Sequence, residues 1–303
     1  LTRNKSRRHD RLVRRLLYRD HQMTFRTRFA PSPTGPLHLG HAYSALVAYE
    51  LAKARNGDFL LRIEDIDQDR SKPEWETQIY RDLSWLGIDW PTPVLRQSEN
   101  MPRYRAALET LWKRGLLYVC RCNRKDIRDA ASAPQEGGAP LIGPDGIVYP
   151  GTCRPGTPAS GQIPQGFALR LDMKRALSTL SNPITFNEIG ENRGTHVTTH
   201  TDMLNIIGDV VLARREMGTS YHLSVVIDDA YQGINTVVRG ADLFDATPIH
   251  VLLQTLLGLD TPTYYHHRLI RDASGKRLAK RDDARAISKY RADGASQKDP
   301  RAL

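Results

Sequence analysis

The sequence of 303 residues has few cysteines and no long uninterrupted apolar run. A membrane-spanning helix needs about 20 predominantly apolar residues, so the sequence predicts no transmembrane helix and no membrane partner. Three cysteines cannot build the disulfide framework of a small secreted protein. We therefore expect a protein of a reducing compartment, the cytoplasm, whose thiols serve as metal ligands or in packing.

Positive charge exceeds negative charge, with 44 Lys and Arg against 34 Asp and Glu, a net charge of +10. Such an excess indicates an anionic partner, for example a nucleic acid or a nucleotide. Residues 1–22 alone hold eight basic and two acidic side chains, a net charge of +6. We interpret them as a basic extension, either disordered or a start placed too early. An RNA-contacting arm and an organellar presequence are the alternatives.

Strand-like and helix-like segments alternate along most of the chain. Short apolar runs predict strands at residues 24–30, 59–65, 221–229 and 234–240. Apolar residues at helical spacing, followed by glycine, predict helices after residue 40, before Gly87, before Gly115 and over 245–258. This alternation is typical of an α/β protein with a parallel sheet.

The middle of the chain has a different composition. Glycine and proline supply 15 of the 33 residues from Pro134 to Gly166, too many for a helical core. We predict one α/β domain in two halves, interrupted by an insertion. The predicted units are the extension 1–22, the first half 23–118, the insertion 119–200, the second half 201–270 and a loop with a short tail, 271–303.

The segment RFAPSPTGPLHLGH, residues 28–41, runs from a predicted strand through a Gly/Pro loop into a helix. Free N–H groups and the dipole at a helix N-terminus favour a phosphate, and Gly35 and Gly40 leave room for one. His38 and His41 are three residues apart and can donate to oxygens that gain charge in phosphoryl transfer. The alternative interpretation is a turn with two surface histidines.

Three cysteines bracket the Gly/Pro-rich segment. Cys120 and Cys122 precede it and Cys153 lies within it, an arrangement that suits a structural Zn²⁺ ion. A fourth ligand is needed, and no histidine lies between Cys122 and Cys153. Asp126, Asp145 or water can supply it. Three free cysteines in a loop are the alternative.

Four ordered motifs together resemble the class I aminoacyl-tRNA synthetases, specifically their glutamyl/glutaminyl branch. The first is residues 28–41, which resemble the HIGH signature. The others are RIEDIDQDR (62–70), YHLSVVIDDAYQGINTVVRGADL (221–243) and GKRLAKR (275–281), which stands where the KMSKS loop is expected. The resemblance implies a Rossmann-like catalytic domain, interrupted by the zinc-binding insertion.

The resemblance also implies roles for individual residues. Arg28 and Arg239 are the candidate carboxylate clamps, Arg239 for the glutamate side chain, because Arg pairs with carboxylates in a planar, bidentate way. Glu64 is the candidate partner of the α-ammonium group, and Ala30, Ser32 and Tyr221 line the glutamate position. The candidate ATP-binding residues are His38, Gly40, His41 and Lys280, of which His38, His41 and Lys280 are also the catalytic candidates. Arg277 and Ala279 depart from the KMSKS consensus, which affects the geometry expected for this loop.

The spacing Cys-x-Cys…Tyr-x-x-x-Cys resembles the glutamyl-queuosine tRNA synthetases and implies Tyr149 as the fourth zinc ligand. Only 23 residues follow Lys280, too few for an anticodon-binding domain. The resemblance implies a monomer that uses ATP and Mg²⁺ to form glutamyl-adenylate. It then implies transfer of glutamate to queuosine in the anticodon loop of tRNA-Asp, a single-stranded target. A truncated glutamyl-tRNA synthetase that charges tRNA-Glu, and a non-catalytic paralogue that binds RNA or glutamate, are the alternatives.

Overall fold

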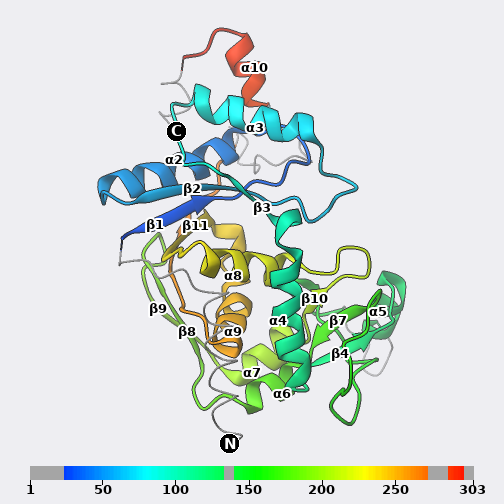
Figure 1. The fold of residues 1–303 in the computed structure, drawn as a ribbon. Helices are drawn as coiled ribbons and strands as arrows, with labels where there is room; N and C mark the ends of the chain where they lie inside the picture. Colours follow the sequence, from blue (N-terminus) through cyan, green and yellow to red (C-terminus); the bar gives the residue numbers. More distant parts are fainter. Residues whose placement is uncertain (1–23, 133–139, 272–285, 297–303) are drawn as a thin grey trace, which may run out of the picture.

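The computed structural model describes residues 24–132, 140–271 and 286–296 (Figure 1). The basic extension 1–22 and the KMSKS-like loop, with Arg277, Ala279 and Lys280, lie outside the described residues. Within the described ranges, every helix is too short or too polar to cross a membrane.

The first half of the chain forms a parallel sheet. Strand β1 (Arg26–Phe29) pairs in parallel with β2 (Asp58–Ile63), which pairs in parallel with β3 (Leu95–Arg96). Helix α2 (Leu39–Ala54) connects β1 to β2, and α3 (Pro73–Trp85) follows β2. The buried face of α2 carries the apolar residues whose spacing predicted it.

The second half forms a four-stranded sheet that lies beside the first. Strand β11 (Thr236–Gly240) pairs in parallel with β12 (Thr263–His267), and β12 with β8 (Ile184–Glu188), while β9 (Gly194–Thr198) is antiparallel to β8. The backbone N–H of Asn235 donates to the carbonyl of Arg26 at 3.2 Å, so β11 lies beside β1. Helix α9 (Thr247–Leu257) connects β11 to β12 and ends at Gly258, in the left-handed conformation. An α/β fold with a parallel sheet is confirmed.

One predicted element is wrong. Residues 221–229, expected to be a strand, form helix α8 (Tyr221–Tyr231), which begins at the N-cap Ser220. Residues 222 to 229 are all buried. A helix that is buried on every side has no polar stripe, so its short apolar run cannot be distinguished from a buried strand by periodicity.

The remaining elements lie between or after these two groups of strands. Strand β7 (Ala168–Leu171) pairs antiparallel with both β4 (Leu117–Cys120) and β10 (Val211–Ala213), while β5 (Ile142–Gly143) and β6 (Gly146–Ile147) form a small hairpin. The other elements are η1 (Gln97–Asn100), α4 (Met101–Lys113), α5 (Arg124–Ala131), α6 (Met173–Ser178), α7 (His200–Asp202), the π-helical turn η2 (Met203–Ile207), η3 (Ala241–Leu243) and α10 (Ile287–Ala292).

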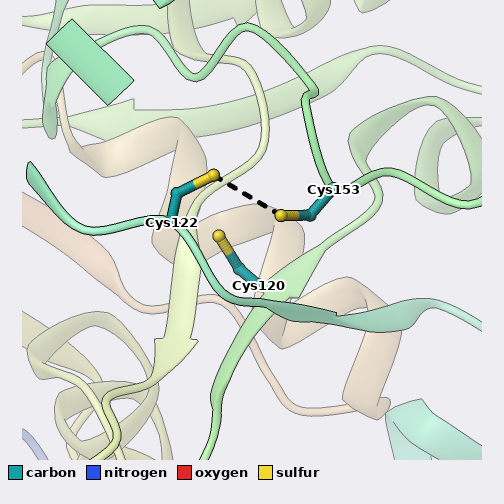
Figure 2. Close-up of side chains that lie close together, drawn as sticks. All are labelled: Cys120, Cys122 and Cys153. Carbon is teal, nitrogen blue, oxygen red and sulfur yellow. Dashed lines mark hydrogen bonds between the residues drawn. The ribbon is translucent and has the colours of Figure 1, made fainter. Parts of the chain in front are cut away.

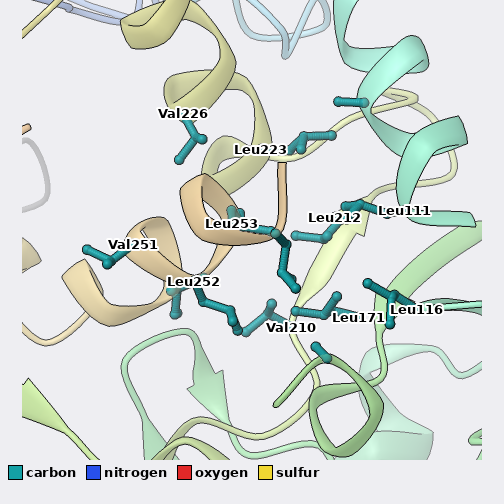
Figure 3. Close-up of a cluster of buried hydrophobic side chains, with 14 of the residues drawn as sticks. Leu111, Leu116, Leu171, Val210, Leu212, Leu223, Val226, Val251, Leu252 and Leu253 are labelled. Atoms are coloured by element: carbon teal, nitrogen blue, oxygen red, sulfur yellow. The ribbon is translucent and has the colours of Figure 1, made fainter. Parts of the chain in front are cut away.

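Two large hydrophobic cores among the described residues support this arrangement. The larger core joins α4, α8 and α9 to the antiparallel strands, and Figure 3 shows Leu111, Leu212 and Leu253 meeting in it. The smaller core lies between α2, α3 and the strands β1 and β2. Neighbouring residues of β11 face different cores, because Val237 belongs to the larger one and Val238 to the smaller one. The cores are therefore adjacent across β11.

Candidate active site and cysteine cluster

A cavity of about 510 Å³ opens at the carboxyl ends of β1, β2 and β11. Ligands of open α/β sheets bind at this edge, where the loops that follow parallel strands converge. The structure brings together nine predicted site residues there: Arg28, Ala30, Ser32, His38, Gly40, His41, Glu64, Tyr221 and Arg239. Ile270 also lines the cavity, and Ala286 pairs with His38. The described residues on both sides of the segment with Lys280 therefore lie at this site.

The two histidines of the first loop form the N-terminal cap of α2. The backbone N–H of Gly40 donates to His38 Nδ1 at 3.1 Å, and the backbone N–H of His38 donates to His41 Nδ1 at 3.2 Å. Because each Nδ1 accepts a hydrogen bond, the proton of each neutral ring lies on Nε2. The first turn of α2 contains no acidic residue, so its dipole is available to an anion.

A buried ion-pair network lies beside Glu64. The Arg28 side chain donates to both carboxylate oxygens of Asp229, at 2.8 and 3.1 Å, and Arg62 donates to Asp229 at 2.6 Å and to Glu64 at 3.0 Å. Burial alone raises the pKa of Asp229, but Arg28 and Arg62 outweigh it and the pKa is lowered. Burial raises the pKa of Glu64, opposed by Arg62. Asp229 thus neutralises much of the charge of Arg28.

Arg239 has a different environment. Its guanidinium donates to His266 Nε2 at 3.0 Å, to His250 Nδ1 at 2.8 Å and to Thr247 Oγ1 at 2.7 Å, and the side chain is only 6% exposed. Three of its five N–H groups are used, and none of the three acceptors is a carboxylate. Two N–H groups have no hydrogen-bond partner among the described residues. A buried guanidinium without a carboxylate partner, facing a cavity, is suited to an anionic ligand.

Sequence reasoning missed the residues that hold these groups in place. Arg62 and Asp229 stood within the quoted motifs, but their contact joins β2 to α8 across 167 residues. His250, His266 and Glu188 carried no motif, and their shared contacts with Arg239 arise only from the packing of α9, β12 and β8 around β11. The available signal was His250 within the apolar segment 247–257 and the adjacent pair His266 and His267.

The cysteine cluster lies at the end of β4, and its residues are not among those that line the cavity. Figure 2 shows Cys120, Cys122 and Cys153 pointing toward one another, and their sulfur atoms all lie within 4.8 Å of one another. The sulfur atoms of Cys122 and Cys153 are 3.4 Å apart. In a tetrahedral zinc site with Zn–S distances of about 2.3 Å, the sulfur atoms are about 3.8 Å apart, so this cluster needs only a small adjustment to hold the ion.

Tyr149 completes the cluster. Its hydroxyl oxygen lies 3.5 Å from the sulfur of Cys120 and 3.4 Å from that of Cys122, and it accepts a hydrogen bond from the backbone N–H of Cys153 at 2.8 Å. Burial and the three cysteines raise the pKa of Tyr149. Burial also raises the pKa of Cys153, but hydrogen bonds, chiefly from Tyr149, outweigh it and lower that pKa to about 7.

The two aspartates considered as alternative ligands have other partners. Asp126 accepts the backbone N–H of Asn123 in the cap of α5, and Asp145 lies 3.2 Å from His222. Arg170 supplies positive charge beside the cluster, since it donates to the sulfur of Cys120 at 3.3 Å and lies over the ring of Tyr149. A nearby cation stabilises thiolates, the form that binds metal.

Comparisons with known proteins identify the family. The profile described as "tRNA synthetases class I (E and Q), catalytic domain" matches residues 24–141 and 182–300. The Glutamyl-Q tRNA(Asp) synthetase of Rhodobacter capsulatus is 63% identical over 279 residues, which are 91% of this chain and 98% of that protein. The Glutamyl-Q tRNA(Asp) synthetase of Geobacter sulfurreducens is 40% identical and covers 86% of this chain and 77% of its own length.

Solved structures agree with this result. A glutamate tRNA ligase from Elizabethkingia meningosepticum, in complex with its amino acid, superimposes with a TM-score of 0.66 at 30% identity. The match covers 86% of this chain but 52% of that protein, so the chain spans about half its length. The methionyl-tRNA synthetase of Mycobacterium tuberculosis, with a TM-score of 0.55 at 12% identity, shares the fold. The chain therefore belongs to the class I tRNA synthetases of the glutamate and glutamine branch, in the group of the glutamyl-Q tRNA(Asp) synthetases.

Proposed function

We propose that this protein activates L-glutamate with ATP and transfers it to the queuosine base in the anticodon of tRNA-Asp. The assignment of glutamate as the amino acid rests on Arg239, a buried cation that faces the cavity and whose hydrogen-bond acceptors are uncharged. The RNA part is supported by the printed names of the relatives at 63% and 40% identity.

The cavity offers a complementary partner for each charge of glutamate. Arg239 binds the side-chain carboxylate with its two remaining N–H groups, and Arg28 assists with the two that Asp229 and Val238 leave. Glu64 binds the α-ammonium group. Ala30, Ser32 and Tyr221 line the space between them. Because Glu64 and Arg239 bind different groups of the amino acid, together they fix it in one orientation, with its α-carboxylate toward the first loop.

ATP binds over that loop. The N-terminus of α2 and the Nε2–H groups of His38 and His41 donate to phosphate oxygens, and Gly40 leaves room for the nucleotide. The α-carboxylate of glutamate attacks the α-phosphate, pyrophosphate leaves, and the residues stabilise the charge that develops on the phosphate oxygens. Lys280 is proposed to bind the leaving pyrophosphate. Mg²⁺ supplies further neutralisation of the triphosphate.

We also propose that the cysteine cluster binds one structural Zn²⁺ ion through Cys120, Cys122, Cys153 and Tyr149. Three sulfur atoms and one phenol oxygen at mutual distances near those of a tetrahedral site support this assignment. Zinc would replace the proton of the Tyr149 hydroxyl, whose pKa is raised by burial and by the three cysteines when no metal is bound. The ion would connect the end of β4 to the Gly/Pro-rich segment, the insertion proposed at residues 119–200.

The deciding experiment measures the transfer of labelled glutamate to tRNA. Bulk tRNA from queuosine-containing cells is compared with tRNA from cells that lack queuosine, each with and without ATP. The proposal expects ATP-dependent labelling of the first tRNA only. Equal labelling of both would assign the 3′ end of tRNA-Glu as the acceptor. Absence of glutamate-dependent ATP–pyrophosphate exchange would support the alternative, a non-catalytic paralogue that binds RNA or glutamate.

A further inference from the structure

One side of Arg239 is connected to a buried carboxylate through a histidine. Arg239 Nε donates to His266 Nε2, and His266 Nδ1 lies 2.5 Å from Glu188 Oε2. A guanidinium can only donate hydrogen bonds, so Nε2 of His266 is unprotonated and the ring proton lies on Nδ1, from which it is donated to Glu188. Glu188 is fixed in turn by the backbone N–H groups of His266 and Gly190, at 3.0 and 2.6 Å.

The other side of Arg239 has a longer connection. Arg239 Nη1 donates to His250 Nδ1, His250 Nε2 lies 3.0 Å from His222 Nδ1, and His222 Nε2 lies 3.2 Å from Asp145 Oδ1. The same reasoning from donors and acceptors applies to this second series of hydrogen bonds. His250 carries its proton on Nε2 and donates to His222, and His222 carries its proton on Nε2 and donates to Asp145. Both rings are then neutral and fully hydrogen-bonded.

The surroundings keep the two histidines that touch Arg239 uncharged. Burial, together with the charge of Arg239, lowers the pKa of His266 to about 4 and lowers the pKa of His250 well below its ordinary value. Both side chains are 2% exposed. Arg239 is therefore held by three hydrogen bonds, and among the described residues no carboxylate is in contact with it. Arg28 and Arg62, in contrast, share the carboxylate of Asp229.

We propose that two relays of neutral histidines position Arg239 and reserve its charge for the side-chain carboxylate of the substrate. The relay residues are His266 and Glu188 on one side, and His250, His222 and Asp145 on the other. All five are positioning residues, since they act on the substrate through Arg239. The inference rests on the proposed function and deepens it, because it explains how the site selects a carboxylate over the uncharged amide of glutamine.

The second relay extends beyond the cavity to Asp145. This residue lies in the turn of the β5–β6 hairpin, four residues before Tyr149, and its side chain is 37% exposed. Gly143 of the same hairpin lies against η2, because an added Cβ would come within 2.2 Å of the carbonyl oxygen of Ile206. Asp145, in the Gly/Pro-rich segment, is thus the outer residue of this relay, and the inner residue, His250, contacts Arg239 in the amino-acid site.

The first test uses glutamate-dependent ATP–pyrophosphate exchange with the full chain. Asp145→Ala removes the outer acceptor, and we expect the KM for glutamate to rise about threefold, with kcat and the KM for ATP unchanged. Asp145→Asn keeps an accepting oxygen and should restore most of this loss. Glu188→Gln should raise the KM for glutamate about tenfold. Asp129→Ala, an exposed aspartate on α5, is the matched control and should have no effect.

Selectivity and additivity separate positioning from general damage. Asp145→Ala should lower the ratio of kcat/KM for glutamate to that for glutamine, because a loosened Arg239 discriminates less between carboxylate and amide. His222→Phe interrupts the same relay, so adding Asp145→Ala to it should change nothing further. Asp145→Ala and Glu188→Gln affect different relays, so their effects on the KM for glutamate should be additive. Unchanged glutamate KM and selectivity in both single variants would overturn the proposal.

A second measurement needs no substrate. Imidazole ¹⁵N–¹H NMR of the histidine-labelled full chain at pH 7 should show three neutral rings, with the proton on Nδ1 in His266 and on Nε2 in His250 and His222. Glu188→Gln should shift the signals of His266, and Asp145→Ala those of His222. Protonated rings or the opposite tautomers would refute the relays even if glutamate activation is confirmed. The predicted tautomers in a protein without exchange activity would support the relays and reject the proposed function.

Discussion

Replacing Arg239 by alanine tests the amino-acid site most directly. The guanidinium is 6% exposed and has two N–H groups without a hydrogen-bond partner among the described residues. A hydrogen bond to a charged group contributes about 1.5–3 kcal/mol, so a carboxylate bound by both groups loses about 3–6 kcal/mol in the variant. At 1.36 kcal/mol for each factor of ten, kcat/KM for glutamate should fall about 10²- to 10⁴-fold.

The assay is glutamate-dependent ATP–pyrophosphate exchange, combined with a thermal melt that confirms folding. Arg105→Ala is the matched control, because Arg105 lies on α4 and pairs with Glu109 at a half-exposed position. It should leave exchange unchanged. A kcat/KM for glutamate within about threefold of the wild-type value in folded Arg239→Ala would refute the assignment of Arg239 to the substrate carboxylate.

Three further predictions concern metal, pH and packing. The purified chain should contain about one zinc ion and Cys153→Ala almost none, as measured by elemental analysis; a metal-free, folded and active wild type would contradict the site. Burial raises the pKa of Asp228 to about 7, so the folded state retains a proton that the unfolded chain releases near pH 4. Wild-type stability relative to Asp228→Asn should therefore decrease from pH 4 to 7 in melting experiments, and parallel curves would contradict this. Leu253→Ala, in the larger core, should reduce the free energy of unfolding in urea by about 2–5 kcal/mol, and a loss below about 1 kcal/mol would show that the core is loosely packed there.

The elements with clear boundaries were predictable from the sequence. Helices α3 and α4 each have one apolar face and are followed by Gly87 and Gly115, both with a positive φ. Helix α8 was not predictable, because both of its faces are buried and its two acidic residues pair inside the protein rather than in water. Local sequence carries the amphipathic pattern but not the ion pairs that permit charge in a buried helix.

The cavity-lining residues were predictable because they fall within contiguous motifs. Nine of the predicted site residues line one cavity, and Tyr149, which the family resemblance implied as a fourth ligand, lies against the cysteine sulfur atoms. Their supports were not predictable. His266 and Glu188 are 27 and 51 residues from Arg239 along the chain, and only the pairing of β11, β12 and β8 brings them together. A histidine in a buried segment has no local feature that distinguishes a relay from ordinary packing.

The cavity's position between two cores links binding to folding cooperativity. Glu64 directly follows Ile63 of the smaller core, whereas Tyr221 packs against the larger one, and both face the cavity. An amino acid that contacts both residues connects the two cores, which can otherwise unfold locally and separately. At a ligand concentration 100 times the Kd, binding adds about 2.7 kcal/mol to the stability of the folded state. Glutamate should therefore slow amide hydrogen exchange in both cores together, including residues far from any contact with it.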